Sequence, residues 1–461
     1  MKLWKQIDVS PYQGMFPCLG DLDGDGRVDF LLYRQGPLTT PGYMVALDHD
    51  GRKLWERGDR AIPSHMPDGA WKEPSLRGIA LVYDIDQDAV RTEVITEFWE
   101  GGKPMLYVLE GATGEVRHAR PSPFDLAIRG GKRSRCHPVA RVAHLQGRGN
   151  PPAIVLFYGA SNFATGQIVA LDAGLNTLWH VSAQPTTVAH VPTVGDVNGD
   201  GRDEILAGMA LLDADGKILW HKAAPNHADC TAMADLGPNA QKALLMSICN
   251  SGPAWCLAAD GRTLWEKTTK EVSHGQGVWV GNFIDSEPGL EAIILRSGHR
   301  GDFLTVRAKD GSNLATFQHR REQEGYPDFP CVVHWLRPRP APSQAPIDRK
   351  GPKALPSVET RIDSLWIPID RCCVDGYGNV VAELAPHDEQ RVRHRLQWGT
   401  TKSHVAVQAF ALDLCGDERE ELVLYQPYHG RSIFIFTQPD SDGRDKPYVH
   451  RENAYQMQSY F

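Results

Sequence analysis

The stretch Gly20–Leu32, which reads GDLDGDGRVDFLL, decides how the rest of the chain is interpreted. Acidic residues occupy positions 1, 3, 5 and 9 of this loop, namely Asp21, Asp23, Asp25 and Asp29, and a glycine stands at position 6. Oxygen ligands at this spacing, with a glycine for the tight turn, suit a hard cation, chiefly calcium. Short apolar runs rich in strand formers flank the loop. The sequence therefore predicts a strand, a calcium-type loop and a second strand.

The same unit recurs in one close copy and two degenerate ones. Residues 196–204 read DVNGDGRDE and supply the candidate ligands Asp196, Asn198, Asp200 and Glu204. Residues 413–421 place a cysteine, a poor ligand for a hard ion, at the third position and lack the glycine at the sixth. Residues 84–88 keep three carboxylates but are followed by Ala89 where the glycine belongs. We expect metal in the first two loops and only a turn in the others.

A second unit follows each strand pair, an apolar run leading into Asp-x-Asp-Gly-x-x-Leu-Trp. Residues 48–55 and 213–220 are clear copies, and looser ones recur along the chain. Asp-Gly between apolar runs is the strongest short-range signal for a β-hairpin. We interpret this unit as turn chemistry plus an aromatic side chain that packs between neighbouring repeats.

The two units together supply four strands and recur about every 40 to 60 residues, which is the size of one β-propeller blade. The predicted fold is all-β, a single β-propeller domain over residues 1–461 with four-stranded blades. Eight blades are expected, or seven if residues 328–386 form a distorted hairpin attached to a neighbour. The proline-rich residues 337–356 cannot pair in a sheet and are expected to form an exposed insertion within the domain.

Composition and charge limit the partners and the compartment. The net charge of −8 argues against nucleic acid or an anionic membrane as a partner. The nine cysteines are odd in number and show no CxxC pair, so the spacing suggests neither a zinc site nor a disulfide framework. The sequence has no apolar run of membrane-spanning length and no signal-peptide core at its start. We expect a monomeric cytoplasmic protein, or a secreted one if a signal has been removed.

Histidines recur shortly before the predicted first strand of five blades. In a propeller the first strands surround the central channel, and the loops leading into them build its mouth. These histidines should therefore converge, either in a direct role or as hydrogen-bonded structural residues. They are His137, His190, His227, His274 and His404.

Four side chains near this predicted mouth carry further chemistry. His227 and Asp229 are two residues apart and so point to the same side of an extended segment, where they suit a base or a metal site, unless Asp229 merely orients a strand. Arg300 offers a planar fork for a carboxylate, or lies in an exposed turn. Tyr158 is a candidate catalytic phenol or a buried packing residue.

Four segments resemble the propeller-type rhamnogalacturonan lyases, and the end of the chain is similar to the end of that family. The segments are residues 196–204, 211–220, 227–236 and 273–291, and the similar end comprises residues 413–423 and 451–455. The sequence departs from that family at Gln276, where aspartate is expected, and at Asn282. Related lyases that act on ulvan and rhamnose-glucuronate linkages use channel His, Tyr and Arg residues. The resemblance implies calcium-dependent β-elimination in a polymer of rhamnose and uronic acid.

The residues can meet the demands of this reaction. Elimination across C4–C5 of a uronate requires neutralisation of the carboxylate, removal of the C5 proton and protonation of the departing oxygen. We expect His137, His190 and His227 to act as acid or base, with Tyr158 as a further candidate, and Arg300 to bind the carboxylate. Asp229 and His274 are expected near a channel cation, calcium or another divalent ion.

The predicted function is therefore a polysaccharide or oligosaccharide lyase that acts on an acidic, rhamnose-containing glycan. The alternative is a non-catalytic calcium-binding propeller that binds glycan or protein. A third interpretation, a quinoprotein dehydrogenase, rests on the Leu-Trp repeats alone and would need a tryptophan that stacks on the cofactor.

Overall fold

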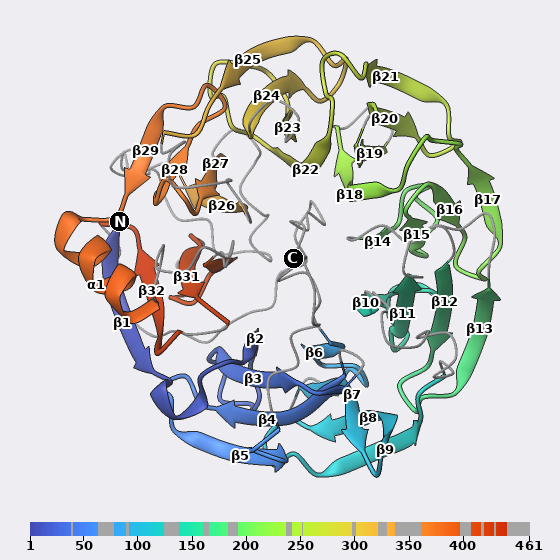
Figure 1. Cartoon of the computed structure of the whole chain (residues 1–461). Coiled ribbons are helices and arrows are strands. Elements are labelled where there is room, and N and C mark those ends of the chain that lie inside the picture. Colours follow the sequence, from blue (N-terminus) through green and yellow to red (C-terminus); the bar gives the residue numbers. More distant parts are fainter. Residues whose placement is uncertain are drawn as a thin grey trace, which may run out of the picture.

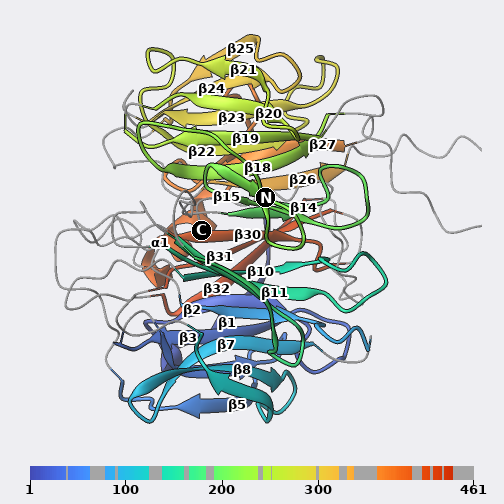
Figure 2. The ribbon, with the colours of Figure 1, turned by 90° about the vertical axis from the view of Figure 1, so that its right-hand side faces the viewer.

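The computed structural model describes residues 1–37, 40–62, 78–88, 92–123, 138–159, 166–182, 192–236, 242–250, 252–296, 301–320, 330–336, 361–396, 407–415, 419–427 and 430–439. These residues form eight four-stranded antiparallel sheets arranged in a ring about a central axis (Figure 1). The side view in Figure 2 shows the ring edge-on, with β5 and β25 at opposite ends. The predicted all-β propeller is confirmed, and it has eight blades rather than seven.

Seven blades are each built from four consecutive strands. The first four blades are β2 (Phe16–Gly20), β3 (Asp29–Gln35), β4 (Pro41–Leu47) and β5 (Lys53–Gly58); β6 (Ala80–Tyr83), β7 (Glu93–Glu100), β8 (Lys103–Glu110) and β9 (Val116–Pro121); β10 (Pro138–Ala143), β11 (Ala153–Gly159), β12 (Gly166–Leu171) and β13 (Thr177–Ser182); and β14 (Thr193–Gly195), β15 (Glu204–Ala207), β16 (Ala210–Leu212) and β17 (Ile218–His221). The next three are β18 (Ala228–Asp235), β19 (Lys242–Ile248), β20 (Ala254–Ala258) and β21 (Thr263–Lys267); β22 (Gly275–Gly281), β23 (Glu291–Arg296), β24 (Asp302–Arg307) and β25 (Asn313–Phe317); and β26 (Cys331–Leu336), β27 (Arg361–Ile367), β28 (Cys372–Val374) and β29 (Val380–Glu383). In each of them the first strand lies nearest the axis and the fourth at the rim (Figure 1).

The eighth blade joins the two ends of the chain. It consists of β30 (Gln408–Leu412), β31 (Glu421–Tyr425), β32 (Ser432–Thr437) and, as its outer strand, β1 (Lys2–Asp8). β1 pairs antiparallel with β32, with Ile7 opposite Ile433 (Figure 1). Closure of the ring by the amino-terminal strand protects the sheet edges that an open ring would expose.

Among the described residues, two helical segments lie outside the blades. The short 3₁₀-helix η1 (Ser10–Tyr12) follows β1, and α1 (Pro386–Leu396) connects β29 to β30. Asp388 and Glu389 lie in the first turn of α1 and basic residues in its last turn, which suits the helix dipole. Glu389 also receives an ion pair from Arg371, with NH1 2.8 Å from Oε1. None of the helices in the described part of the chain is both long and apolar enough to cross a bilayer.

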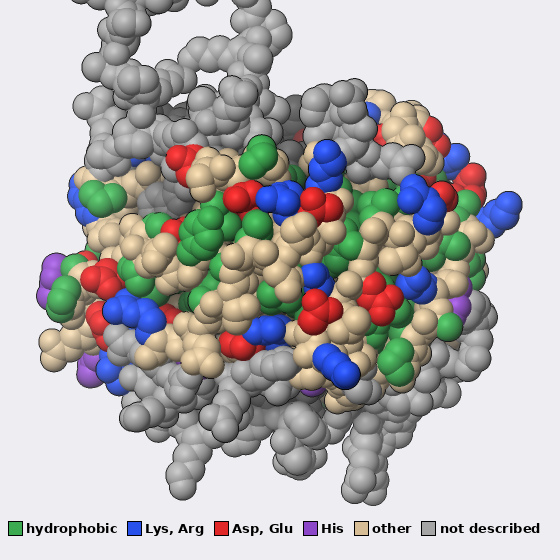
Figure 3. Space-filling view, turned by 90° about the horizontal axis from the view of Figure 1, so that it is seen from above, with side chains coloured by type: hydrophobic (Ala, Val, Ile, Leu, Met, Phe, Trp, Pro, Cys, Tyr) green, Lys and Arg blue, Asp and Glu red, His purple; other side chains and the backbone are tan. Residues whose placement is uncertain are grey.

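The core lies between the blades. The described residues form eight apolar clusters, and each joins two neighbouring blades, as Cys230 on β18 and Val278 on β22 do within one of them. β4 is buried along its whole length, whereas β17 alternates between half-buried and exposed residues. On the rim seen in Figure 3, Lys and Arg side chains are interspersed with Asp and Glu. The second and third strands of a blade therefore appear as apolar runs and the outer strand as an alternating pattern.

The Asp-Gly and Leu-Trp parts of the second unit interlock between blades. Trp220 Nε1 donates to the carbonyl of Ala259 at 2.8 Å, in the hairpin of the next blade. Gly261 in that hairpin has φ of +83°, and a Cβ there would lie 2.9 Å from the Trp220 ring. Trp55, Trp179 and Trp265 make equivalent bonds to the blade that follows each of them. The interpretation of this unit as a turn plus an aromatic packed between blades is confirmed.

Candidate functional site

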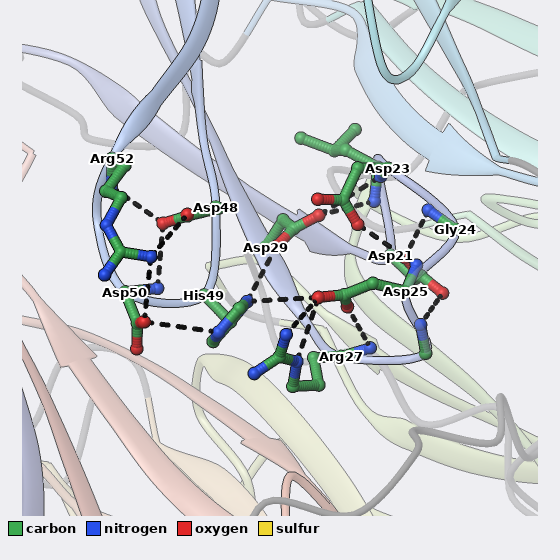
Figure 4. Close-up of polar contacts among 12 residues, drawn as sticks. Asp21, Asp23, Gly24, Asp25, Arg27, Asp29, Asp48, His49, Asp50 and Arg52 are labelled. Carbon is green, nitrogen blue, oxygen red and sulfur yellow. Dashed lines mark hydrogen bonds and ion pairs between the residues drawn. The ribbon is translucent and has the colours of Figure 1, made fainter.

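The loop between β2 and β3 adopts a compact turn around Asp21. The amides of Gly24 and Gly26 donate to the two carboxylate oxygens of Asp21, each at 2.8 Å (Figure 4). Both glycines have positive φ, +79° and +82°, which a side chain would disfavour. Asp29 Oδ2 accepts the amide of Leu22 at 2.9 Å and so ties the turn to the start of β3.

Three carboxylates converge in this loop. One oxygen each from Asp21, Asp23 and Asp29 lie within 4.8 Å of one another. Asp29 is fully buried, and its Oδ1 has no hydrogen-bond partner among the described residues. Burial, with the nearby charge of Asp23, raises the pKa of Asp29 to about 8. An all-oxygen donor set with an unsatisfied buried oxygen fits a hard cation, so these residues would hold calcium.

Asp25 lies beside that group and has different partners. Its Oδ2 accepts from Arg27 Nε at 2.9 Å and lies 3.5 Å from His49 Nδ1 (Figure 4). Hydrogen bonding and charge from Arg27 lower the pKa of Asp25 despite its partial burial. The geometry therefore gathers three of the four predicted ligands in this loop.

The loop between β14 and β15 repeats the turn. Asp196 accepts the amides of Gly199 at 2.6 Å and Gly201 at 3.1 Å. Glu204 Oε2 accepts the amide of Val197 at 2.9 Å. Asn198 Nδ2 donates to Glu204 Oε1 at 2.7 Å and to Asp200 Oδ2 at 3.2 Å, so rotation of this amide would present its oxygen to a cation instead. The four predicted ligands are thus brought to one turn.

Calcium is expected to raise the melting temperature of chelator-treated protein. A ligand at about 100 times its Kd adds about 2.7 kcal/mol to the stability of the folded state. Asp21→Ala should reduce this calcium response, and Asp21→Ala combined with Asp196→Ala should abolish it. Asp260→Ala, which removes an exposed hairpin aspartate, is the matched control and should keep the full response. A response of full size in the double variant would show that these loops are not the calcium sites.

In the degenerate loop of the second blade, an arginine side chain lies among the carboxylates. Asp84, Asp86 and Glu93 place one oxygen each within 4.8 Å. Arg117 from β9 enters this group, with NH1 2.6 Å from Glu93 Oε1 and 2.8 Å from Asp86 Oδ2. Its NH2 lies 2.6 Å from Glu110 Oε2. The guanidinium supplies positive charge to these carboxylates.

In the sixth and eighth blades a buried glutamate at the same place accepts backbone amides of the loop. Glu421 Oε2 accepts the amides of Leu414 and Cys415, and its Oε1 accepts the Thr437 hydroxyl at 2.8 Å. Glu291 Oε2 accepts the amides of Phe283 and Ile284 at 2.7 and 2.9 Å. Its Oε1 has no hydrogen-bond partner in the described ranges, and burial raises the pKa of Glu291 to about 7.

Glu291→Gln is expected to gain stability relative to the wild type as the pH rises. Folded Glu291 keeps its proton up to about pH 7, above its ordinary pKa of 4.5, so its stabilising contribution is lost as the pH rises through that window. Glutamine carries no charge at any pH. The difference in unfolding free energy between variant and wild type should shift by about 1 to 3 kcal/mol between about pH 5 and pH 8. Urea denaturation at both pH values measures it; Glu115→Gln, exposed between β8 and β9, should show no such shift.

A second cluster lies at the starts of the innermost strands β18 and β22, which are neighbours near the axis in Figure 1. His227 Nε2 is 3.0 Å from Asp229 Oδ1, and His274 Nε2 is 3.1 Å from Asp229 Oδ2. Cys249, which follows β19, places Sγ 3.6 Å from His274 Nε2. Asp229 is 1% exposed, whereas the side chains of His227 and His274 are 13% and 27% exposed. We call His227, Asp229, Cys249 and His274 the axial cluster.

Local irregularities in two strands build the axial cluster. The pairing of β18 with β19 shifts at Asp229, and that of β22 with β23 shifts at Gln276. Such bulges re-aim side chains at the end of a strand. A Cβ at Gly275 would lie 2.7 Å from the Ser247 Cβ, so only glycine lets β22 approach β19 this closely. The sequence prediction that Asp229 and His274 meet agrees with this geometry, but it did not include Cys249.

The remaining predicted site residues do not extend this cluster within the part of the chain that the structure describes. Tyr158 lies in β11, one residue before its end, and is 1% exposed in the apolar cluster between the second and third blades. Asn282 follows β22, and its amide donates to Asp363 Oδ2 of the next blade at 2.8 Å. The other predicted residues, His137, His190, His404 and Arg300, lie outside the described residues, as does the proline-rich segment 337–356.

Arg296 and Asp302 form a buried ion pair beside the axial cluster. The sequence alone did not predict this pair. Arg296 Nε and NH2 donate to the two oxygens of Asp302 at 3.0 and 2.6 Å, and NH1 donates to the Glu271 carbonyl at 3.1 Å. Arg296 pairs in register with Gly275, the residue after His274. This two-pronged contact holds the ends of β23 and β24 together next to the cluster.

Comparison with known proteins agrees with this architecture. A family model described as rhamnogalacturonan lyase family 11, C-terminal domain, matches residues 133–299. The rhamnogalacturonan endolyase YesW of Bacillus subtilis (strain 168) is 24% identical over 347 residues, covering 61% of this chain and 54% of that protein. The chain thus spans about half the length of this curated relative.

Solved structures show the same fold. The rhamnogalacturonan lyase PL11 of Bacillus licheniformis aligns with a TM-score of 0.63 at 19% identity, covering 97% of this chain and 77% of that one. The rhamnogalacturonan lyase YesW aligns with a TM-score of 0.59 at 19% identity, covering 92% and 72%. The chain is therefore a β-propeller that resembles the rhamnogalacturonan lyases, with the axial cluster inside the matched segment.

Proposed function

We propose that the protein is a polysaccharide or oligosaccharide lyase that cleaves a glycan containing rhamnose and uronate by metal-assisted β-elimination. The observation that carries the proposal is the axial cluster, because its two imidazoles share one buried carboxylate within the segment matched by the family model. The curated relative and both solved relatives are named as rhamnogalacturonan lyases, which supports this substrate class.

The axial cluster has the chemistry that proton transfer in this reaction needs. The C5 proton must be removed by a base, and the departing C4 oxygen must receive a proton from an acid. Asp229 orients the His227 and His274 rings through separate oxygens, so each imidazole is held in place while its outer edge is part-exposed. We assign His227 to acid or base chemistry, with His137 and His190 as its candidate partners.

The uronate carboxylate needs positive charge opposite it during elimination. We assign Arg300 to this role, since a guanidinium binds a carboxylate through two parallel hydrogen bonds. A divalent cation near Asp229 and His274 would supply further positive charge and polarise the carboxylate. Tyr158 remains a candidate acid or base. Its side chain is buried, so substrate would have to approach its hydroxyl group through the core.

The test is ultraviolet absorbance by unsaturated uronate products. Purified protein is incubated with a panel of acidic rhamnose-containing glycans and their oligosaccharides, with calcium and with EDTA. A rise in absorbance on one of them is expected, and its loss in EDTA, in protein shown by circular dichroism to stay folded, would support a cation in the reaction. A flat trace across the panel together with measurable glycan binding would favour the non-catalytic propeller instead.

A further inference from the structure

We propose that the axial cluster is a binding site for a divalent metal that accepts nitrogen and sulfur ligands, represented by zinc, rather than for calcium. The cluster offers the donors of His227, Asp229, Cys249 and His274. Metal binding itself does not depend on the proposed lyase function, but the role of the metal in elimination rests on it. An imidazole nitrogen that binds the ion cannot also transfer a proton, so in the metal-bound protein the acid and base roles fall to His137 and His190.

The donor types decide against calcium. Calcium takes six to eight oxygen ligands, as the loop around Asp21 can provide. The axial cluster has one carboxylate, two imidazoles and a thiol, so at most two of its donor atoms are oxygen. Two histidines with a carboxylate and a cysteine are ligand types found at zinc sites, and a thiolate favours soft or borderline metals. Calcium therefore fits the outer loops and does not fit this site.

The spacing of the donors agrees with a small tetrahedral ion. His227, Asp229 and Cys249 place one donor atom each within 4.8 Å of one another. The two His to Asp229 distances are 3.0 and 3.1 Å, and Cys249 Sγ lies 3.6 Å from His274 Nε2. Four ligands about 2.0 to 2.3 Å from a tetrahedral zinc ion lie about 3.3 to 3.6 Å from one another. His227, Asp229 and Cys249 therefore converge on one position, and His274 adjoins them through Asp229 and Cys249.

The backbone holds these donors in place. Cys249 N donates to the carbonyl of His227 at 3.0 Å, and Gly252 N donates back to the Cys249 carbonyl at 3.2 Å. Asp229 lies in β18, and His274 immediately precedes β22, the innermost strand of the next blade. Donors supplied by three strand ends are pre-organised, so little ordering is needed when an ion binds.

Cys249 differs from the thiols that only fill the core. Cys256 is buried in an apolar cluster, and burial raises its pKa to about 12. Cys230 adjoins Asp229 in sequence but packs among apolar residues, its thiol near the Val278 carbonyl, and burial raises its pKa to about 12 as well. Cys249 instead directs its sulfur at an imidazole. On metal binding its thiol proton would pass to solvent and the thiolate would coordinate the ion.

Cobalt(II) is the probe for this site, because a thiolate bound to cobalt gives a near-ultraviolet charge-transfer band that oxygen ligands do not give. The full chain is freed of metal with a chelator and then kept in excess calcium, so that the outer loops are filled. Titration with cobalt should produce this band at one equivalent, and zinc should abolish it by displacement. Calcium in large excess should leave it unchanged.

Two cysteine variants separate the axial thiol from the others. Cys249→Ser should lose the charge-transfer band and weaken zinc binding at least about tenfold. Cys18→Ser, a half-buried thiol on β2, should keep both. Cys249→Asp replaces sulfur with oxygen and should weaken zinc binding while allowing calcium to compete.

The proposal is overturned if cobalt gives no thiolate band, if Cys249→Ser binds zinc as the wild type does, or if calcium displaces zinc. In those cases the cluster is a hydrogen-bonded His-Asp-His arrangement without metal. These readouts need no substrate. If cobalt gives the band but the protein cleaves no glycan, the metal site stands and the lyase function is rejected. If the protein cleaves glycan but cobalt gives no band, the lyase function stands and the metal site is rejected.

Discussion

His227→Ala is expected to lower the turnover of glycan elimination at least about 100-fold, because it removes an imidazole that serves as acid or base in the metal-free cluster and as a ligand once an ion is bound. The imidazole is the only part of His227 that reaches Asp229, at 3.0 Å, and alanine removes it. Initial rates from product absorbance measure the effect. The His227 side chain is 13% exposed and its removal takes one partner from the buried Asp229, so the variant should lose about 1 to 3 kcal/mol of stability and remain folded.

His180→Ala is the matched control for this variant. His180 lies on β13, and its Nε2 is 3.2 Å from Gln167 Oε1 on the exposed side of the third blade. Its replacement should leave both turnover and melting temperature close to those of the wild type. Native turnover in folded His227→Ala would reject the assignment of this histidine, and a large fall in the melting temperature would mean that it is structural.

The fold was predictable because each repeated unit carries its own local chemistry. Trp220 and Gly261 belong to successive copies of the same motif, and their contact joins adjacent blades. The amino-terminal strand β1 carries no such motif, although it pairs with β32 and places Ile7 in the apolar cluster between the eighth and first blades. Its place in the eighth blade depends on closure of the ring, a property of the whole chain. The repeated motifs therefore do not predict β1, and α1, which lies between two blades, is equally outside them.

The candidate site was only partly predictable. Asp229 and His274 could be paired in advance because equivalent strands of neighbouring blades run side by side. Cys249 follows β19, and only the bulge in β18 and the close approach at Gly275 bring it to the same place. The contact of Arg117 with this loop was not predicted. Arg117 lies on β9, 24 positions after Glu93, and nothing in residues 84–88 indicates that an arginine from that strand reaches them. The positions of Cys249 and Arg117 in these sites depend on contacts between strands that are distant in sequence.

Arg117→Ala should destabilise the protein by about 2 to 4 kcal/mol, because it leaves buried carboxylates without their positive partner. Glu93 is fully buried, and Arg117 lies within 2.8 Å of three carboxylates. Burial already raises the pKa of Glu93 to about 7 in the presence of Arg117. Glu93 can take up a proton at low pH, so the penalty should be larger at about pH 8 than at about pH 5. Urea denaturation at the two pH values measures it.

Arg262→Ala controls for the loss of an arginine in an ordinary surface ion pair. Arg262 and Asp260 are 61% and 68% exposed and 3.9 Å apart, so this variant should change stability by less than about 0.5 kcal/mol. Equal effects of the two variants would contradict the burial argument.

Calcium should restore part of the stability that Arg117→Ala loses. Asp84, Asp86 and Glu93 would then face one another as Asp21, Asp23 and Asp29 do in the first blade. Gln87 already adopts the left-handed backbone, with φ of +58°, that Gly24 adopts at the equivalent place. The melting temperature of the variant should therefore rise more with calcium than that of the wild type. If both respond equally, the turn cannot hold an ion, and Arg117 neutralises the loop without standing in for a metal.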